Sequence, residues 1–177
     1  VVHVLGGFIS ESVHGIARDA AGRILATGYV EFPFTTNAIA ARFLPDGSFD
    51  PSFSPPEGWS IIFFGMGNAI AEDPGTETVW VVGWADGVFI WRWNPAGGDP
   101  LVDEISVPGC QLAIGSAVAV QPDHRVLFAG DCAPSVFPPS DWQVFVGRLL
   151  ADGSLDTTFG NGGFQIVSFD LVPPSRD

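Results

Sequence analysis

Apolar positions along the chain fall in short runs that turn-forming residues interrupt. Three of these runs close on a glycine, at residues 24–28, 79–83 and 126–130. No segment shows the 3.6-residue apolar period of an amphipathic helix, whereas β-branched and aromatic runs bounded by Gly, Pro, Asn and Asp are typical of strands. The pattern therefore predicts an all-β protein without helices.

The apolar runs are parts of a longer unit that is repeated. Each glycine-closed run follows a small-apolar segment, at residues 14–17, 68–71 and 116–119. Each also precedes an arginine beside a large apolar residue, at Arg42, Arg92 and Arg148. The first and third copies lie roughly 100 residues apart with the second between them, which predicts three repeats of about 50 residues.

Turn residues divide each repeat into four strands. They follow the first strand at 19–22, 73–75 and 121–123, and the third strand at 45–47, 95–98 and 151–153. A fourth apolar run follows near 60–64, 101–107 and 164–169. Four antiparallel strands per repeat are typical of a β-propeller blade. We expect residues 1–177 to form one β-propeller segment, with blades at 8–64, 65–109 and 110–170.

Composition and charge exclude several classes of protein. With 46% hydrophobic and 12% aromatic residues in 177, the chain can bury a core, which excludes a disordered polymer. Basic residues number 7 against 20 acidic ones, giving a formal net charge of −13. Nucleic acids and anionic membranes attract clustered Lys and Arg, so neither is expected as a partner. No apolar run approaches the roughly 18 residues of a membrane span, so no membrane insertion is expected.

The repeats resemble those of the delta-60 repeat family of bacterial β-propeller-like proteins. Residues 120–130 are similar to the first part of that family's unit, and residues 152–160 to its Asp-Gly-Ser-Leu-Asp-x-x-Phe-Gly part. The second copy departs from the pattern at 94–99, which lacks Asp-Gly-Ser-x-Asp. The resemblance implies a secreted or cell-surface bacterial repeat protein, and it implies no reaction and no catalytic residues.

Two turns carry the motif Asp-Gly-Ser-x-Asp. Its main members are Asp46, Gly47 and Asp50 in the first copy, and Asp152, Gly153 and Asp156 in the third. Two carboxylates around a glycine can offer oxygens to Ca²⁺, but calcium takes six or more oxygens and the motif supplies fewer. Asp before Gly also closes a tight turn through its own backbone. The structural turn is therefore favoured, with no cofactor, and Ca²⁺ is the alternative.

The arginines Arg42, Arg92 and Arg148 allow two interpretations. Each can clamp an anionic ligand through a bidentate contact. Each can instead pair with an acid of its own blade, such as Asp50 or Asp156. Recurrence in every blade favours the structural pair, because repeat proteins reuse structural residues in each unit.

His14, Asn68 and Ser116 occupy matching positions at the start of the innermost strand. Propellers line the mouth of their central channel there, so this is where a ligand site is predicted. Ordinary polar rim residues are the alternative, since no carboxylate beside His14 tunes it. The histidines lack the spacing of zinc ligands, and no sequence signature of a nucleophilic serine or cysteine occurs.

The two cysteines, Cys110 and Cys132, lie in the third repeat. Both fall in connections that open on the same face of an up-and-down blade, which predicts a disulfide. Closing the loop between them stabilises the fold by about 3 kcal/mol in the chain-entropy model. A buried unpaired cysteine pair is the alternative.

Two longer connections carry apolar side chains that either form a contact patch or fold back on the blade. They are residues 31–37, with Phe32 and Phe34, and residues 131–141, with Val136 and Phe137. Both outcomes stay open at this point, although long loops are where proteins often place their contacts.

These features favour a non-catalytic propeller module for binding or assembly, secreted or on the cell surface. An enzyme or lectin with its site at the channel mouth is one alternative, and a purely structural repeat is another. Propellers have 4–8 blades, so three blades cannot complete a ring. We therefore expect either a homodimer or additional blades from a longer chain.

Overall fold

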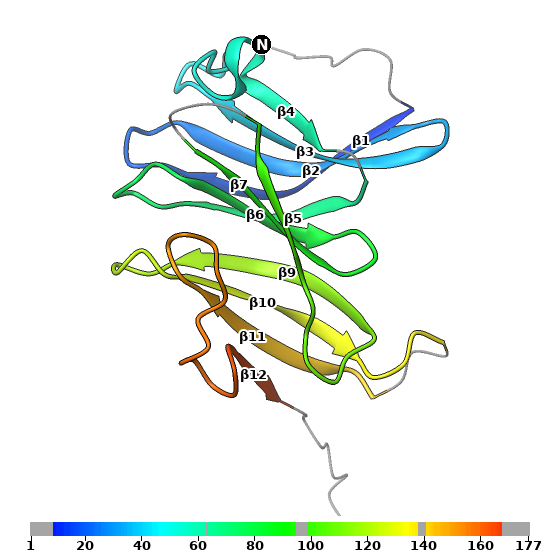
Figure 1. Cartoon of the computed structure of the whole chain (residues 1–177). Coiled ribbons are helices and arrows are strands. Elements are labelled where there is room, and N and C mark those ends of the chain that lie inside the picture. The colour runs from blue at the N-terminus through cyan, green and yellow to red at the C-terminus, as the bar shows by residue number, and fades with distance from the viewer. Residues whose placement is uncertain (1–8, 63, 95–98, 138–140, 168–177) are drawn as a thin grey trace, which may run out of the picture.

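Three four-stranded antiparallel sheets make up the protein (Figure 1). The computed structural model describes residues 9–62, 64–94, 99–137 and 141–167. The first sheet contains β1 (Ser10–Arg18), β2 (Ile24–Phe32), β3 (Thr35–Phe43) and β4 (Trp59–Ile62). The second contains β5 (Met66–Glu72), β6 (Val79–Trp84), β7 (Val88–Trp93) and β8 (Leu101–Ile105). The third contains β9 (Leu112–Val120), β10 (Val126–Ala133), β11 (Gln143–Leu149) and β12 (Phe164–Val167).

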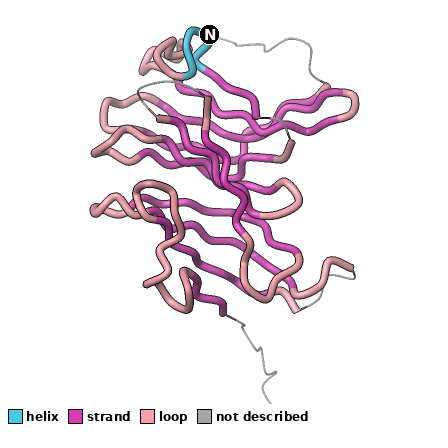
Figure 2. The backbone as a smooth tube through the Cα atoms, in the orientation of Figure 1, coloured by secondary structure: helices cyan, strands magenta, loops and turns pink. Residues whose placement is uncertain are grey.

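Each sheet is an up-and-down blade, since its strands pair in sequence order. The blades stack one on another, as the tube view also shows (Figure 2). The first strand of each later blade packs on the blade before it: β5 contacts β1, β2 and β3, and β9 contacts β5, β6 and β7. The prediction of three four-stranded, propeller-like blades is therefore confirmed.

Two apolar cores lie between the blades. Val79, Val81 and Trp91 of the middle blade pack with Leu25 and neighbouring residues of the first. On the opposite face of the middle blade, Trp80, Val82 and Ile90 pack with residues of the third, among them Phe128, Phe145 and Leu149. Because β6 is covered on both faces, its run of residues is continuously apolar and does not alternate.

Two local features differ from the sequence-based expectation. A short helical turn, η1 (Ser54–Gly58), precedes β4, although Pro55 within it has extended backbone angles (φ −57°, ψ 144°). The expected connection at 31–37 is shorter than predicted, because β2 continues to Phe32 and β3 begins at Thr35. Pairing of Phe32 with Thr35 leaves only Pro33 and Phe34 at the tip of the hairpin.

Candidate functional site

The residues predicted for the channel mouth share one structural position. His14, Asn68 and Ser116 are each skipped by the pairing between the first and second strands of their blade. Each is the extra residue of a β-bulge, a feature that redirects a side chain. The sequence predicted these residues at the start of the innermost strand. They lie instead within β1, β5 and β9.

Hydrogen bonds connect the bulges from blade to blade. His14 Nδ1 lies 3.2 Å from Asn68 Oδ1, and Asn68 Nδ2 donates to the Gly115 carbonyl at 2.8 Å. The His14 ring also meets Tyr29 edge-on, with 5.3 Å between ring centroids. These bonds hold the innermost strands together, while His14 and Ser116 remain exposed at the surface.

A glycine on the second strand accommodates each bulge. An added Cβ on Gly28, Gly83 or Gly130 would lie 1.8 Å from a backbone carbonyl oxygen, belonging to Ser12, Met66 or Ile114 respectively. That separation is far below van der Waals contact, and a backbone atom cannot move aside as a side chain can. The glycine that ends each repeated apolar run is therefore required by the bulge opposite it.

The two Asp-Gly-Ser-x-Asp turns have the same hydrogen bonds. Asp46 Oδ1 accepts from the Ser48 amide at 2.9 Å and from the Ser48 hydroxyl at 2.6 Å, and Asp152 does the same with Ser154. Gly47 and Gly153 adopt positive φ, at 85° and 91°. The bonds to Ser48 lower the pKa of Asp46 below its usual value of 3.8. This geometry supports the turn interpretation.

The second aspartate of each turn pairs with the arginine of the third strand. Arg42 Nε donates to Asp50 Oδ2 at 2.8 Å, and Arg148 Nε donates to Asp156 Oδ2 at 2.9 Å. Burial acts to raise the pKa of Asp50, but hydrogen bonds from Ser52 and Arg42 outweigh it and lower that pKa. The first and third arginines are thus structural, as the sequence favoured. Within the described residues, no three His, Cys, Asp or Glu side chains gather as metal ligands do.

The middle arginine has a different environment. Arg92 lies over the Trp80 ring, 5.3 Å from its centroid. A Cβ added to Gly153 would lie 2.8 Å from Arg92 Nη1, so Arg92 packs on the turn of the next blade. The turn of its own blade, at 95–98, lies outside the described residues.

An ion cluster between the first two blades was not predicted from the sequence. Arg23 is hydrogen-bonded to Asp19, and its guanidinium lies 3.7 Å from Asp50, 3.9 Å from Glu72 and 3.6 Å from Glu77. Burial and the nearby charge of Asp19 raise the pKa of Glu72. The sequence did carry one indication of this cluster, the arginine that precedes the second strand in the first and third repeats. Arg125 occupies the position equivalent to Arg23 and lies 3.3 Å from Asp156.

The structure joins Cys110 to Cys132, as predicted. Cys110 lies in the connection before β9, and Cys132 lies inside β10 opposite Ala113. The bond fixes that connection to the core strand of the third blade. Cys132 is fully buried in the core between the second and third blades.

Phe34, Val136 and Phe137 do not fold back on their blades, whereas Phe32 lies within β2 and is partly buried. Phe34 is 96% exposed and Phe137 is 91% exposed, and Val136 is more than half exposed. These side chains protrude from the end of the blades at which β2 meets β3 and β10 meets β11. Their exposure leaves these side chains available for a contact patch, which stays a prediction.

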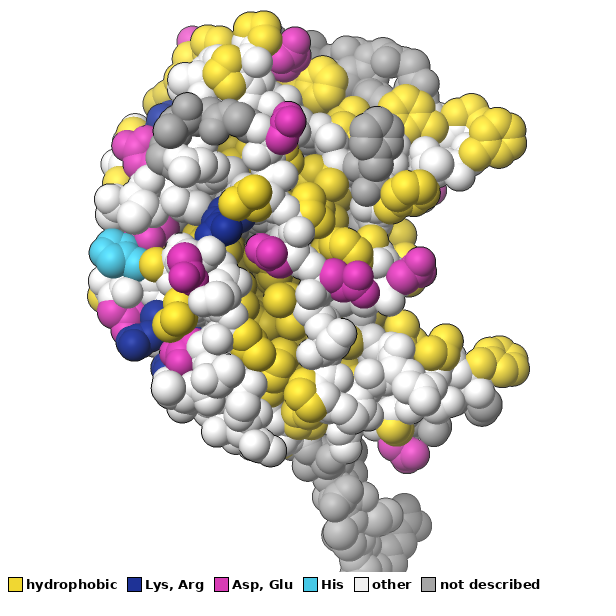
Figure 3. All heavy atoms as spheres, viewed as in Figure 1, with side chains coloured by type: hydrophobic (Ala, Val, Ile, Leu, Met, Phe, Trp, Pro, Cys, Tyr) yellow, Lys and Arg dark blue, Asp and Glu magenta, His cyan; other side chains and the backbone are white. Residues whose placement is uncertain are grey.

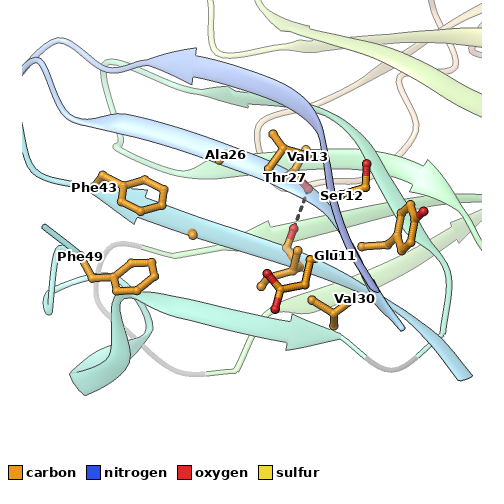
Figure 4. A pocket seen from close by; sticks show the side chains of 11 residues that line it. Glu11, Ser12, Val13, Ala26, Thr27, Val30, Phe43 and Phe49 are labelled. Carbon is orange, nitrogen blue, oxygen red and sulfur yellow. Dashed lines mark hydrogen bonds between the residues drawn. The ribbon is translucent and has the colours of Figure 1, made fainter. Parts of the chain in front are cut away.

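The face of the first blade that points away from the second blade is apolar. A hollow of about 280 Å³ lies on it, lined by residues that include Val13, Ala26, Val30, Phe43 and Phe49 (Figure 4). Phe43 and Phe49 stack at one end, with ring centroids 4.9 Å apart. Among the described residues, β1, β2 and β3 pack against β5 of the second blade through the opposite face.

Residues 22–53 and 121–159 match the model of a protein family described as "Domain of unknown function (DUF5122) beta-propeller". This match supports a β-propeller repeat family. The matched segments fall in the first and third repeats, in agreement with the departure of the second copy from the Asp-Gly-Ser-x-Asp pattern. No curated protein matches the chain. Among the described residues, no helix has the length and apolar character needed to cross a membrane.

Proposed function

We propose that the protein is a non-catalytic β-propeller module whose role is assembly and binding. In this proposal two copies join head to tail, the third blade of each against the first blade of the other, into a six-bladed ring. Additional blades supplied by a longer chain would cover the same two faces. Head-to-tail contacts that close under rotation give a ring.

The observation that carries the proposal is the exposure of equivalent residues in successive repeats. Ile16 is 73% exposed, whereas Ile70 at the same position of the second repeat is 6% exposed. Ile24 is 42% exposed, whereas the equivalent Val79 is 1% exposed. The difference arises because another blade covers the second repeat on this side. The first blade therefore presents a surface built to receive a preceding blade.

The third blade presents the complementary surface. Its Leu127, Ala129 and Arg148 are equivalent to Leu25, Thr27 and Arg42, which lie on the face of the first blade that the second blade covers. Burying apolar area contributes about 25 cal/mol per Å², so covering two blade faces provides several kcal/mol for association. The same contact that joins blades inside the chain can thus join two chains.

Charge substitutions on the two open faces test this contact. Thr27 and Val81 both approach Gly67, since a Cβ there would lie 2.1 Å from Thr27 Oγ1 and 3.1 Å from Val81 Cγ1. The equivalent pair across the proposed interface is Ala129 of one copy and Ala26 of the other. Ala26→Arg alone and Ala129→Glu alone are each expected to prevent assembly, because each buries an unpaired charge. Sedimentation velocity measures the outcome.

Mixing the two variants supplies the control. In the mixed ring one contact pairs the introduced arginine with the introduced glutamate, and the other contact has the original residues. Assembly is therefore expected to return in the mixture but in neither variant alone. If both variants assemble like the unmodified chain, or if the mixture stays unassembled, the head-to-tail contact is wrong. Both substitutions lie on open faces, so unchanged melting temperatures are expected in the unassembled chains.

A ligand site at His14, Asn68 and Ser116 is the second candidate function. It is favoured by the alignment of three bulged residues along successive innermost strands, two of them exposed.

We also propose that the protein is secreted or displayed at the cell surface. The Cys110–Cys132 bond supports this location, because disulfides persist in oxidising compartments.

A further inference from the structure

Exposed apolar side chains gather at one end of the blades. This loop end consists of the described residues of the connections β2–β3, β4–β5, β6–β7, β8–β9 and β10–β11. Phe34 and Phe137 stand almost fully exposed on it, and Phe64, Val136 and Trp142 are also exposed. They lie on different blades, Phe34 on the first and Phe137 on the third, and exposed apolar patches on one side of a protein mark contact sites.

Arginine side chains lie at one end of the blades, whereas carboxylates lie at both ends. Among the described residues, every arginine lies toward the opposite end, at Arg18, Arg23, Arg42, Arg92, Arg125 and Arg148. The loop end carries carboxylates and no arginine within the described part of the chain, with Glu11, Asp86, Glu104 and Asp131 exposed and Glu31 partly so. In Figure 3 the dark-blue side chains lie in the left half of the view, magenta side chains lie on both sides, and yellow side chains project on the right.

We infer that the loop end binds a basic polypeptide segment in which arginine or lysine alternates with apolar residues. Phe34 on the first blade and Phe137 on the third are the anchors, and Glu31, Asp86 and Asp131 lie at the same end of the blades. This inference adds a partner to the proposed function. It does not depend on ring closure, because each three-blade chain carries its own loop end.

The chemistry of this surface selects a cationic and apolar partner. A guanidinium or ammonium group over an aromatic face is attracted by the ring quadrupole. Carboxylates near the rings increase that attraction and accelerate the encounter with a basic partner. The same charge repels nucleic acids and anionic bilayers. Aromatic anchors surrounded by polar groups are the usual arrangement of an energetic centre in a protein contact.

A synthetic peptide of alternating Arg and Leu residues serves as the probe, with a Glu and Leu peptide as its charge-reversed counterpart. Titration calorimetry is expected to show binding of the Arg peptide only. The double variant Phe34→Ser with Phe137→Ser is expected to weaken that binding about tenfold, which corresponds to about 1.4 kcal/mol. The double variant Glu31→Gln with Asp131→Asn is expected to weaken it by a similar factor and to reduce its dependence on salt.

A charge-matched variant at the opposite end separates a local site from general attraction. Glu57 and Asp99 are exposed and lie away from the loop end, so Glu57→Gln with Asp99→Asn should change the affinity less than about twofold. Equal weakening by both charge variants would overturn the inference, as would unchanged affinity in the aromatic variant. Binding of a neutral oligosaccharide such as maltohexaose, without binding of the peptide, would also overturn it.

Discussion

Replacing Asp50 with alanine is expected to lower the free energy of unfolding by about 3–5 kcal/mol, because it leaves the buried Arg42 without its ion partner. The Arg42 and Asp50 side chains are 6% and 5% exposed, and Nε lies 2.8 Å from Oδ2. Urea unfolding followed by tryptophan fluorescence measures the change. The double variant Arg42→Met with Asp50→Ala should recover part of the loss, since no unpaired charge then remains.

Asp46→Ala is the matched control in the same turn. Asp46 is exposed and bonds only to Ser48 among the described partners, so a much smaller loss is expected.

Because the pKa of Asp50 is lowered in the folded protein, the contribution of Asp50 to the free energy of unfolding is present above pH 3.8 and is lost as pH falls through the lowered pKa. The difference between Asp50→Ala and the unmodified protein should therefore narrow in acid. A large stabilisation of the unmodified protein by Ca²⁺, absent in both variants, would contradict the turn account.

Gly83→Ala is expected to destabilise the protein by about 3 kcal/mol or more, beyond the usual cost of overpacking a core. The new Cβ would lie 1.8 Å from the Met66 carbonyl oxygen and 2.8 Å from the Trp91 ring. Relief requires the bulge at Asn68 to move, and this would disturb the hydrogen bond from Asn68 to the third blade. Thermal and urea unfolding both report the loss.

Gly87 in the same blade provides the comparison. An added Cβ there meets only Glu104 Oε1, at 3.7 Å, so Gly87→Ala should leave stability within about 0.5 kcal/mol of the unmodified protein. Equal effects of the two substitutions would show that the bulge is not a rigid feature of the blade. Gly28→Ala and Gly130→Ala are expected to behave like Gly83→Ala, because both glycines face an equivalent carbonyl oxygen.

The repeat pattern was sufficient to predict the blades. Apolar runs, turn residues and spacing are local signals, and the strands that they predicted are present in three sheets. Recurrence also predicted the Asp-Gly turns and the pairs Arg42–Asp50 and Arg148–Asp156. A structural contact within a blade needs the same residues in each repeat that forms it. The disulfide was predictable because both cysteines fall on one blade.

Features that depend on contacts between blades were harder to predict. Sequence alignment placed His14, Asn68 and Ser116 at one position, but the bulge that makes them special appears only in the strand pairing. Arg23 also lies near Glu72 and Glu77 of the second blade, and no spacing within one repeat predicts these two contacts. Phe34 is exposed because the β2–β3 hairpin continues to a two-residue tip. The sequence had instead suggested a longer connection over residues 31–37.

Multi-angle light scattering on the 177-residue chain tests the central claim, that these blades are a propeller arc which a second copy completes. The account predicts a concentration-dependent particle of twice the 18.7 kDa chain mass, which dissociates when Ala26→Arg is introduced. A compact and fully folded particle that stays at 18.7 kDa at every concentration would contradict it.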